Sequence, residues 1–92
     1  MKAEAEAIVG DLAALAATGA PADGGPARAI AERHRQLITR WFYPCTPALH
    51  RALGEMYVAD PRFAAYYERH RSGLAAFARD AWRANADRSS DG

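Results

Sequence analysis

One cysteine in this 92-residue chain has a local sequence that could make it chemically reactive. Cys45 lies between Pro44 and Pro47, and it directly precedes Thr46, which has the side chain of a helix N-cap. Unpaired backbone N–H groups and the helix dipole at such an N-terminus favour a thiolate, the form that attacks electrophiles. The alternative is that Cys45 is a small buried hydrophobic residue that fills a gap, as most lone cysteines do. The residues themselves leave both interpretations open.

Aromatic side chains gather in sequence around this cysteine. Three come just before it and four lie in the two helices expected after it: Trp41, Phe42, Tyr43, Tyr57, Phe63, Tyr66 and Tyr67. Such rings can line an apolar pocket for a flat heterocyclic ligand. Ordinary core packing is the alternative, and on this basis we assign four aromatic residues to the core: Trp41, Phe63, Phe77 and Trp82. The tyrosines, each with a polar tip, fit either role.

Other kinds of site find little support in the sequence. The three histidines His34, His50 and His70 show no i, i+4 pair and no second cysteine that would complete a zinc site, so we expect no metal. A histidine on an inner face could hold a haem, but the chain is short to wrap a porphyrin. No orienting Asn or Asp and no glycine-rich oxyanion loop accompanies Cys45, so we expect neither an enzyme nor a cofactor.

Length and composition limit the remaining possibilities. The chain is long enough for one domain, and its net charge of +1 lacks the basic excess that direct nucleic-acid binding needs. Glu4, Glu6 and Asp11 interrupt any signal-peptide core, and one cysteine cannot form an internal disulfide, so we expect a cytoplasmic protein. No stretch approaches the roughly 18 to 20 apolar residues of a membrane-spanning helix. We therefore expect a monomer that does not contact membranes.

The elements that would position these residues are helices. The chain has 23 alanines, which favour an all-α fold. Start and stop residues predict five helices, over residues 3–17, 26–41, 47–59, 61–69 and from 74 to about 84. Residues 18–25 are rich in Gly, Pro and Asp and predict a flexible loop. Residues 86–92 lose the apolar period and predict a disordered tail.

Apolar residues at helical spacing predict the buried face of each helix. These are Ile8, Leu12 and Leu15; then Ile30, His34, Leu37, Ile38 and Trp41; then Leu49, Leu53, Met56 and Tyr57; then Phe63, Tyr66 and Tyr67; and finally Leu74, Phe77, Ala78, Ala81 and Trp82.

Two runs of residues are similar to a known family. Residues 34–45, which end in Trp-Phe-Tyr-Pro-Cys, and residues 53–63, which end in Met-Tyr-Val-Ala-Asp-Pro-Arg-Phe, closely resemble the TipAS antibiotic-recognition domain of certain MerR-type transcription regulators. Parts of residues 67–86 are similar as well, so the resemblance covers most of residues 5–87. Two departures from the family are the lack of a DNA-binding helix-turn-helix and a coiled coil, and an apparent start inside the family's domain. We therefore expect a single domain, residues 1–92, that lacks the N-terminal lid helices.

The resemblance implies a globin-like helical fold without haem, and a cleft that receives thiopeptide antibiotics. It also implies a cysteine, matched here by Cys45, that adds to a dehydroalanine of the bound antibiotic. The ligand-binding residues expected on this basis are Cys45, Trp41, Phe42, Tyr43, His50, Tyr57, Phe63, Tyr66 and Tyr67. The implied function is sensing or sequestration of a macrocyclic peptide antibiotic with covalent capture. The alternative is a non-covalent effector-binding or protein-interaction module that recognises a different apolar ligand.

Overall fold

The computed structural model describes residues 2–91, with side chains through Arg88, and its backbone is helical apart from short connections. The helices are α1 (Lys2–Ala17), α2 (Gly25–Trp41), α3 (Pro47–Ala59), α4 (Pro61–His70) and α5 (Leu74–Asp91). No strand occurs within this described range. The all-α class and the five helices predicted from the sequence are therefore confirmed.

Two of the helices begin at side-chain caps followed by proline. The hydroxyl of Thr46 accepts a hydrogen bond from the Leu49 N–H at 3.1 Å at the start of α3. A carboxylate oxygen of Asp60 accepts one from the Arg62 N–H at 2.9 Å at the start of α4. Each cap accepts a hydrogen bond from a backbone N–H that has no partner inside the helix. The residue after each cap is a proline, which has no backbone N–H and therefore needs no hydrogen-bond acceptor. Both helices therefore begin where the sequence predicts.

The start of α5 is capped from another helix. Glu68 of α4 accepts hydrogen bonds from the N–H groups of Gly73, at 2.8 Å, and Ala75, at 2.9 Å. Gly73 has a φ of +86°, a conformation that residues with a Cβ rarely adopt. The sequence pattern did not identify this cap, because the carboxylate lies several residues before the helix that it caps. It fixes the turn between α4 and α5.

The segment between α1 and α2 contains its own hydrogen bonds. The Thr18 hydroxyl donates to the Leu15 carbonyl oxygen at 2.6 Å, and the Gly24 N–H donates to the Pro21 carbonyl oxygen at 3.1 Å. Gly19 has a φ of +82°. The flexibility expected for residues 18–25 stays a prediction, and α2 already begins at Gly25.

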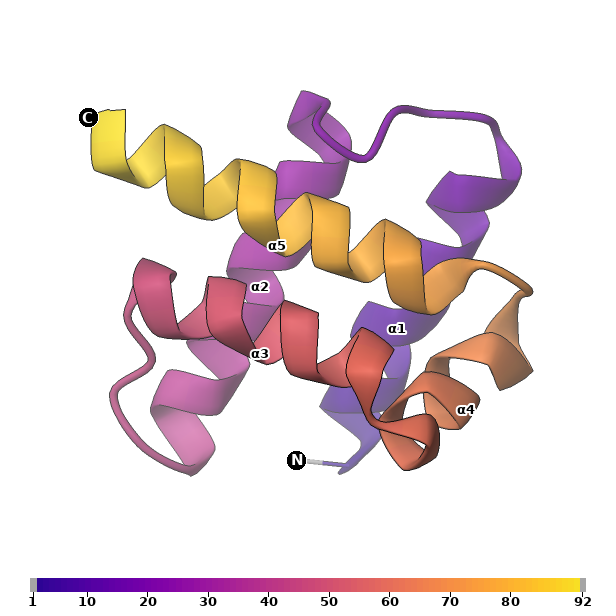
Figure 1. Ribbon diagram of the computed structural model, residues 1–92, viewed down its shortest axis with the longest axis horizontal. Helices are drawn as coiled ribbons and strands as arrows, with labels where there is room; N and C mark the ends of the chain where they lie inside the picture. The colour runs from indigo at the N-terminus through magenta and orange to yellow at the C-terminus, as the bar shows by residue number, and fades with distance from the viewer. Residues whose placement is uncertain (1, 92) are drawn as a thin grey trace.

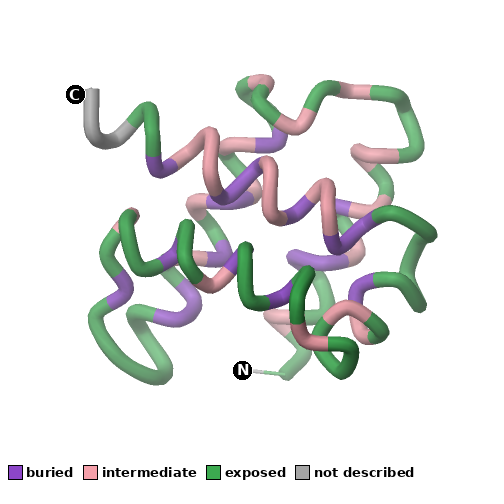
Figure 2. The backbone as a smooth tube through the Cα atoms, in the orientation of Figure 1, coloured by how far each residue is buried: buried purple, intermediate pink, exposed green. Residues whose placement is uncertain are grey.

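The helices form two layers around one core. In Figure 1, α3 and α5 cross the front, α1 and α2 lie behind them, and α4 lies at the lower right. Figure 2 shows buried positions recurring along α5, which contacts every other helix. The main core cluster consists of Val9, Leu12, Ala27, Ala31, Tyr57, Tyr67, Leu74, Ala75, Ala78, Ala81 and Trp82. The core is therefore organised around α5.

Helices α3 and α5 approach each other closely at Gly54. A Cβ placed on Gly54 would lie 3.2 Å from the Arg79 Cα and 3.3 Å from the Trp82 Cδ1. Both distances are tighter than ordinary van der Waals contact, and one of the two atoms belongs to the backbone. The missing side chain of Gly54 therefore allows these helices to pack at this distance.

This contact corrects the expected buried face of α3. The residues that α3 buries are His50, Gly54 and Tyr57, whereas Leu49 and Met56 are exposed. The apolar pattern was misleading because a glycine at a close helix crossing and a histidine with a buried partner both lie inside. The core assignments of Trp41 and Phe63 were also wrong, since both side chains are exposed, whereas Trp82 is fully buried.

Helix α5 is longer than the sequence pattern indicates, since it continues through Asp91. The disorder expected for residues 86–92 stays a prediction, and Gly92 lies outside the described residues. The helix is supported by contacts that the local sequence does not reveal. Asn85 donates to a Glu32 carboxylate oxygen at 3.0 Å, Ala86 is buried, and Asp87 pairs with Arg51 at 2.5 Å.

We expect Gly54→Ala to lower the free energy of unfolding by about 1–3 kcal/mol, because the added methyl group overpacks against the α5 backbone. Urea denaturation followed by circular dichroism measures this change.

Gly10→Ala is the matched control. Gly10 lies inside α1 and a Cβ there would meet nothing within 4 Å, so this variant should be more stable by roughly 0.5–1 kcal/mol. Equal effects of the two substitutions would show that the α3–α5 contact does not require a glycine at position 54.

Candidate functional site

An apolar cleft with a volume of about 610 Å³ opens at the end of the molecule where α4 lies. This size is within the range of roughly 300–1,000 Å³ that is typical of small-molecule sites. Four helices and the turn after α2 contribute its lining: Ala5, His34, Leu37, Ile38, Phe42, Tyr57, Arg62, Phe63, Tyr66, Tyr67 and Arg69.

Aromatic rings in contact with one another form one wall of the cleft. The Tyr57 ring stacks on Phe63 with centroids 5.2 Å apart, and it lies 5.4 Å from the ring of Tyr67. Tyr66 meets Tyr67 edge to face at 5.5 Å. Tyr57 and Tyr67 are buried, whereas Phe63 is 40% exposed and Phe42 61% exposed. The buried Tyr57 ring therefore supports the exposed ring of Phe63, and Phe42 adds a second exposed ring to the cleft.

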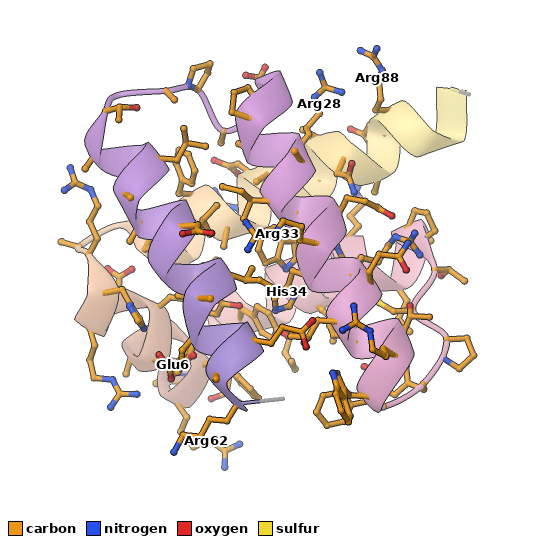
Figure 3. The ribbon with its side chains drawn as sticks, turned by 180° about the vertical axis from the view of Figure 1, so that it is seen from behind. Glu6, Arg28, Arg33, His34, Arg62 and Arg88 are labelled. Atoms are coloured by element: carbon orange, nitrogen blue, oxygen red, sulfur yellow. The ribbon has the colours of Figure 1, made fainter. Side chains whose placement is uncertain are left out.

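Charged side chains lie at the rim. The Arg69 guanidinium is 5.5 Å from the Tyr66 ring centroid, and the Tyr66 hydroxyl donates to Glu6 at 3.1 Å. Arg62 pairs with Asp60 at 3.2 Å. In Figure 3, Arg62 and Glu6 lie at the same lower end of the molecule, and His34 lies between α1 and α2. The cleft thus has an apolar wall and a polar rim.

The structure brings five of the nine expected site residues into this cleft: Phe42, Tyr57, Phe63, Tyr66 and Tyr67. Trp41 is exposed and its indole N–H donates to Glu4 at 3.2 Å, away from the cleft lining. Tyr43, His50 and Cys45 do not line the cleft either. His34, Leu37 and Ile38 also line the cleft, although their apolar helical spacing predicts a core face of α2.

Cys45 lies on a different, shallower hollow of about 230 Å³ at the turn between α2 and α3. Its backbone N–H donates to the Thr39 hydroxyl at 3.1 Å, and its carbonyl oxygen accepts from Arg35 at 2.7 Å. Arg35 is in turn held by Glu32, with a shortest N–O distance of 2.5 Å. These contacts fix the turn and leave only 2% of Cys45 exposed.

The expectation that the helix N-terminus favours a Cys45 thiolate is corrected by this environment. Burial raises the pKa of the thiol, and the positive charge of Arg35 offsets this effect only in part. The Sγ atom lies 3.8 Å from the Thr46 carbonyl oxygen, a contact in which a neutral thiol can act as donor. Loss of hydration therefore outweighs the attraction between the thiolate and Arg35.

Two histidines meet below the cleft. Nδ1 of His34 lies 2.9 Å from Nε2 of His50, and both side chains are buried. Burial lowers the pKa of His34 to about 4, and burial together with the neighbouring His34 and Arg35 lowers the pKa of His50 to about 3. Both rings are therefore neutral near pH 7. His50, expected to contact ligand, instead lies behind His34.

Other types of site find no geometric support in the described part of the chain. No group of three His, Cys, Asp or Glu side chains there could hold a metal ion. Within the same residues, no helix is both long and apolar enough to span a bilayer.

The neutral histidine pair predicts a pH dependence of stability. Because both folded pKa values lie below the ordinary 6.5, the unfolded chain takes up protons first as the pH falls, so stability is present above pH 6.5 and is lost toward pH 4. We expect the free energy of unfolding to fall by on the order of 2–4 kcal/mol between pH 7 and pH 5, measured by urea denaturation.

The chosen range separates the histidines from the carboxylates. Glu32, whose pKa is lowered to about 2 by hydrogen bonds from Arg35, Gln36 and Asn85, contributes its pH dependence only at lower pH. His50→Phe should reduce the slope between pH 7 and pH 5, and an unchanged slope in this variant would rule out the pair as its source.

Comparison with known proteins identifies the family. The sequence profile of the TipAS antibiotic-recognition domain matches residues 1–85. The transcriptional activator TipA of Streptomyces coelicolor is 46% identical over 85 residues, which is 92% of this chain and 34% of that protein. The transcriptional regulator SkgA of Caulobacter vibrioides is 40% identical over 84 residues, which is 90% of this chain and 33% of that protein. The chain thus spans about a third of the length of these curated relatives.

Solved structures agree with the sequence comparison. The complex of nosiheptide with TipAS from Streptomyces lividans matches with a TM-score of 0.89 and 45% identity, over 95% of this chain and 61% of that one. The antibiotic-binding domain of a TipA-class multidrug-resistance transcriptional regulator matches with a TM-score of 0.85 and 45% identity, over 95% of this chain and 93% of that one. This chain belongs to the TipAS antibiotic-recognition domain family.

Proposed function

We propose that this chain binds a thiopeptide-type antibiotic in the aromatic cleft and thereby senses or sequesters it. The observation that carries the proposal is the cleft itself, in which exposed Phe42 and Phe63 rings accompany a wall of buried tyrosines. A flat heterocycle that stacks on such a ring gains roughly 0.5–1.5 kcal/mol beyond the burial of apolar area. The nosiheptide-bound relative supports this ligand class. The role is binding and not turnover, and it involves no direct contact with nucleic acid.

The packing of the cleft favours a ligand-binding role over a simple gap in the core. The rings of Tyr57 and Tyr67 are buried and pack against each other, so little conformational entropy is lost when a ligand meets the wall. Arg62 and Arg69 at the rim keep their charges near solvent and can contact the polar outer part of a macrocycle. The site thus suits a ligand with an apolar part that enters the cleft and a polar part that stays outside, near the rim.

We further propose that Cys45 captures the bound antibiotic. The Sγ atom adds to the β-carbon of a dehydroalanine, one C–S bond forms as the C=C bond becomes single, and the thiol proton ends on the α-carbon. No group leaves, so the product has the summed mass of protein and ligand. Burial, together with smaller contributions from Tyr43 and Cys45, raises the pKa of Tyr57 to about 12, so this phenol stays neutral in the cleft wall.

Capture requires the turn between α2 and α3 to open. Cys45 is almost completely buried, and its backbone is held by Thr39 and Arg35. Opening must break these contacts before the sulfur can reach an alkene. We therefore expect binding in the cleft to be fast and covalent capture to be slower.

A second candidate is non-covalent recognition of a different apolar ligand, as an effector-binding or protein-interaction module. The burial and raised pKa of Cys45 favour it. It keeps the cleft as the binding site and assigns the cysteine to packing. The two candidates differ in whether a ligand-derived mass remains on the denatured protein.

We expect intact-mass spectrometry after incubation with a dehydroalanine-bearing thiopeptide to reveal a protein heavier by the full ligand mass. The adduct should form faster at higher pH, because a larger fraction of the thiol is then ionised. Cys45→Ala should bind the same ligand without any adduct.

The controls separate binding from capture. Rapid reaction of the folded protein with a coloured disulfide reagent would show that Cys45 is accessible, and it would contradict the expectation that the turn between α2 and α3 must open first. Saturated binding that leaves no adduct after long incubation would reject covalent capture and support the second candidate.

The cleft is tested with two residues of similar exposure. Phe63, 40% exposed, lines the cleft, and Leu49, 38% exposed, does not. We expect Phe63→Ala to raise the Kd for nosiheptide about tenfold or more, because a stacking face is lost. Leu49→Ala should leave the Kd within about twofold, within the error expected for a residue outside the contact. Calorimetric titration measures both, and equal losses would reject this cleft as the site.

A further inference from the structure

The histidine pair lies flat on a buried indole. The His34 and His50 ring centroids lie 4.7 Å and 4.8 Å from that of Trp82, at interplanar angles of 32° and 18°. The two imidazoles are 5.1 Å apart with an N–N distance of 2.9 Å, which is the geometry of rings joined edge to edge. Trp82 therefore supports both rings on one face, and their hydrogen bond lies nearly parallel to the indole.

The environments of two ring nitrogens indicate which tautomer each histidine adopts. Nδ1 of His50 is buried without a hydrogen-bond partner among the described residues. Nε2 of His34 also has no partner there, but it is not among the sealed polar atoms, and His34 lines the cleft. The free nitrogen of His34 thus faces the cleft, and the free nitrogen of His50 faces the core.

Only two arrangements of protons keep the hydrogen bond between neutral rings. If His34 donates from Nδ1, the Nδ1–H of His50 becomes a buried donor without a partner. If His50 donates from Nε2, its Nδ1 is only an unpaired acceptor, and Nε2 of His34 carries a proton toward the cleft. The Nε1–H of Trp82 is already a buried donor without a partner in the described part of the chain, and the first arrangement would add a second one at His50. Buried donors without partners are rarer in proteins than buried acceptors without partners, so the second arrangement is favoured.

We propose that His34 is a specificity-determining residue of the cleft, whose Nε2–H donates a hydrogen bond to an uncharged acceptor of the bound peptide antibiotic, an azole nitrogen or a peptide carbonyl oxygen. This inference rests on the function proposed above and names the chemistry that the cleft selects. The hydroxyl groups of the cleft tyrosines can rotate, so each can either donate or accept a hydrogen bond. The Nε2 atom of His34 can only donate, because the hydrogen bond with His50 fixes the tautomer. A ligand that places a hydrogen-bond donor at this position is therefore disfavoured.

The position of the proton is tested in the ligand-free protein. Long-range proton–nitrogen correlation spectra of the nitrogen-15 histidine-labelled chain near pH 7 should show the Nε2–H tautomer for both His34 and His50. A Nδ1–H tautomer for His34 would overturn the proposal, whatever the ligand.

The contact with ligand is tested by titration with nosiheptide. We expect the His34 Nε2 resonance to shift on saturation. Binding without a change at His34 would overturn this inference and leave the proposed function standing. Absence of any binding to the wild-type chain would overturn both.

Two variants separate recognition from structure. His34→Gln and His34→Leu both lose the ring contact with His50, but only glutamine retains a donor that can reach the cleft. We expect His34→Leu to bind nosiheptide about three- to tenfold more weakly than His34→Gln, the effect of one neutral hydrogen bond. Circular dichroism checks that both variants are folded. Equal affinities of the two folded variants would overturn the proposal.

Discussion

The contacts of Trp82 are the interaction on which the rest of the structure depends. Its indole is fully buried, with Gly54 of α3 against one side and the two imidazoles against a face. Gly54 sets how closely α3 approaches α5, and therefore where the next turn of α3 directs Tyr57 into the cleft wall. His34 is supported by the same ring and lies at the floor. The core and the cleft thus share one central side chain.

This arrangement places polar groups in the interior at a cost. Two imidazoles lose their hydration, and neither has a carboxylate partner, so each remains neutral. One hydrogen bond between them offsets part of the penalty, and one nitrogen of His50 stays unpaired. The histidine pair places one polar ring, that of His34, in the lining of the cleft.

The sequence predicted the features that depend on neighbouring residues. Thr46 with Pro47 and Asp60 with Pro61 give correct helix starts because capping involves only the next few residues. Burial depends on distant residues, so the apolar pattern wrongly placed Leu49 inside and missed Gly54. Five expected aromatic residues meet in the cleft, but His34, Leu37 and Ile38 were taken for core. The apolar residues along a helix have the same spacing whether they line a cleft or pack in the core. Only the positions of α4 and α1 relative to α2 determine which of the two occurs here.

The properties of Cys45 illustrate the same limit at a chemical level. The local sequence places the sulfur near a helix N-terminus, and that alone favours a thiolate. The folded chain adds burial, which depends on Arg35 and Thr39 of the preceding helix, and burial raises the pKa of the thiol more than the charge of Arg35 lowers it. Phe42 lies in the cleft only three residues before Cys45, and both belong to one non-helical turn. Access to the sulfur therefore depends on the stability of that turn more than on the electrostatics at the sulfur. A change at Thr39 or Arg35 would alter the proposed capture while leaving the aromatic wall unchanged, so affinity and covalent reactivity can vary independently.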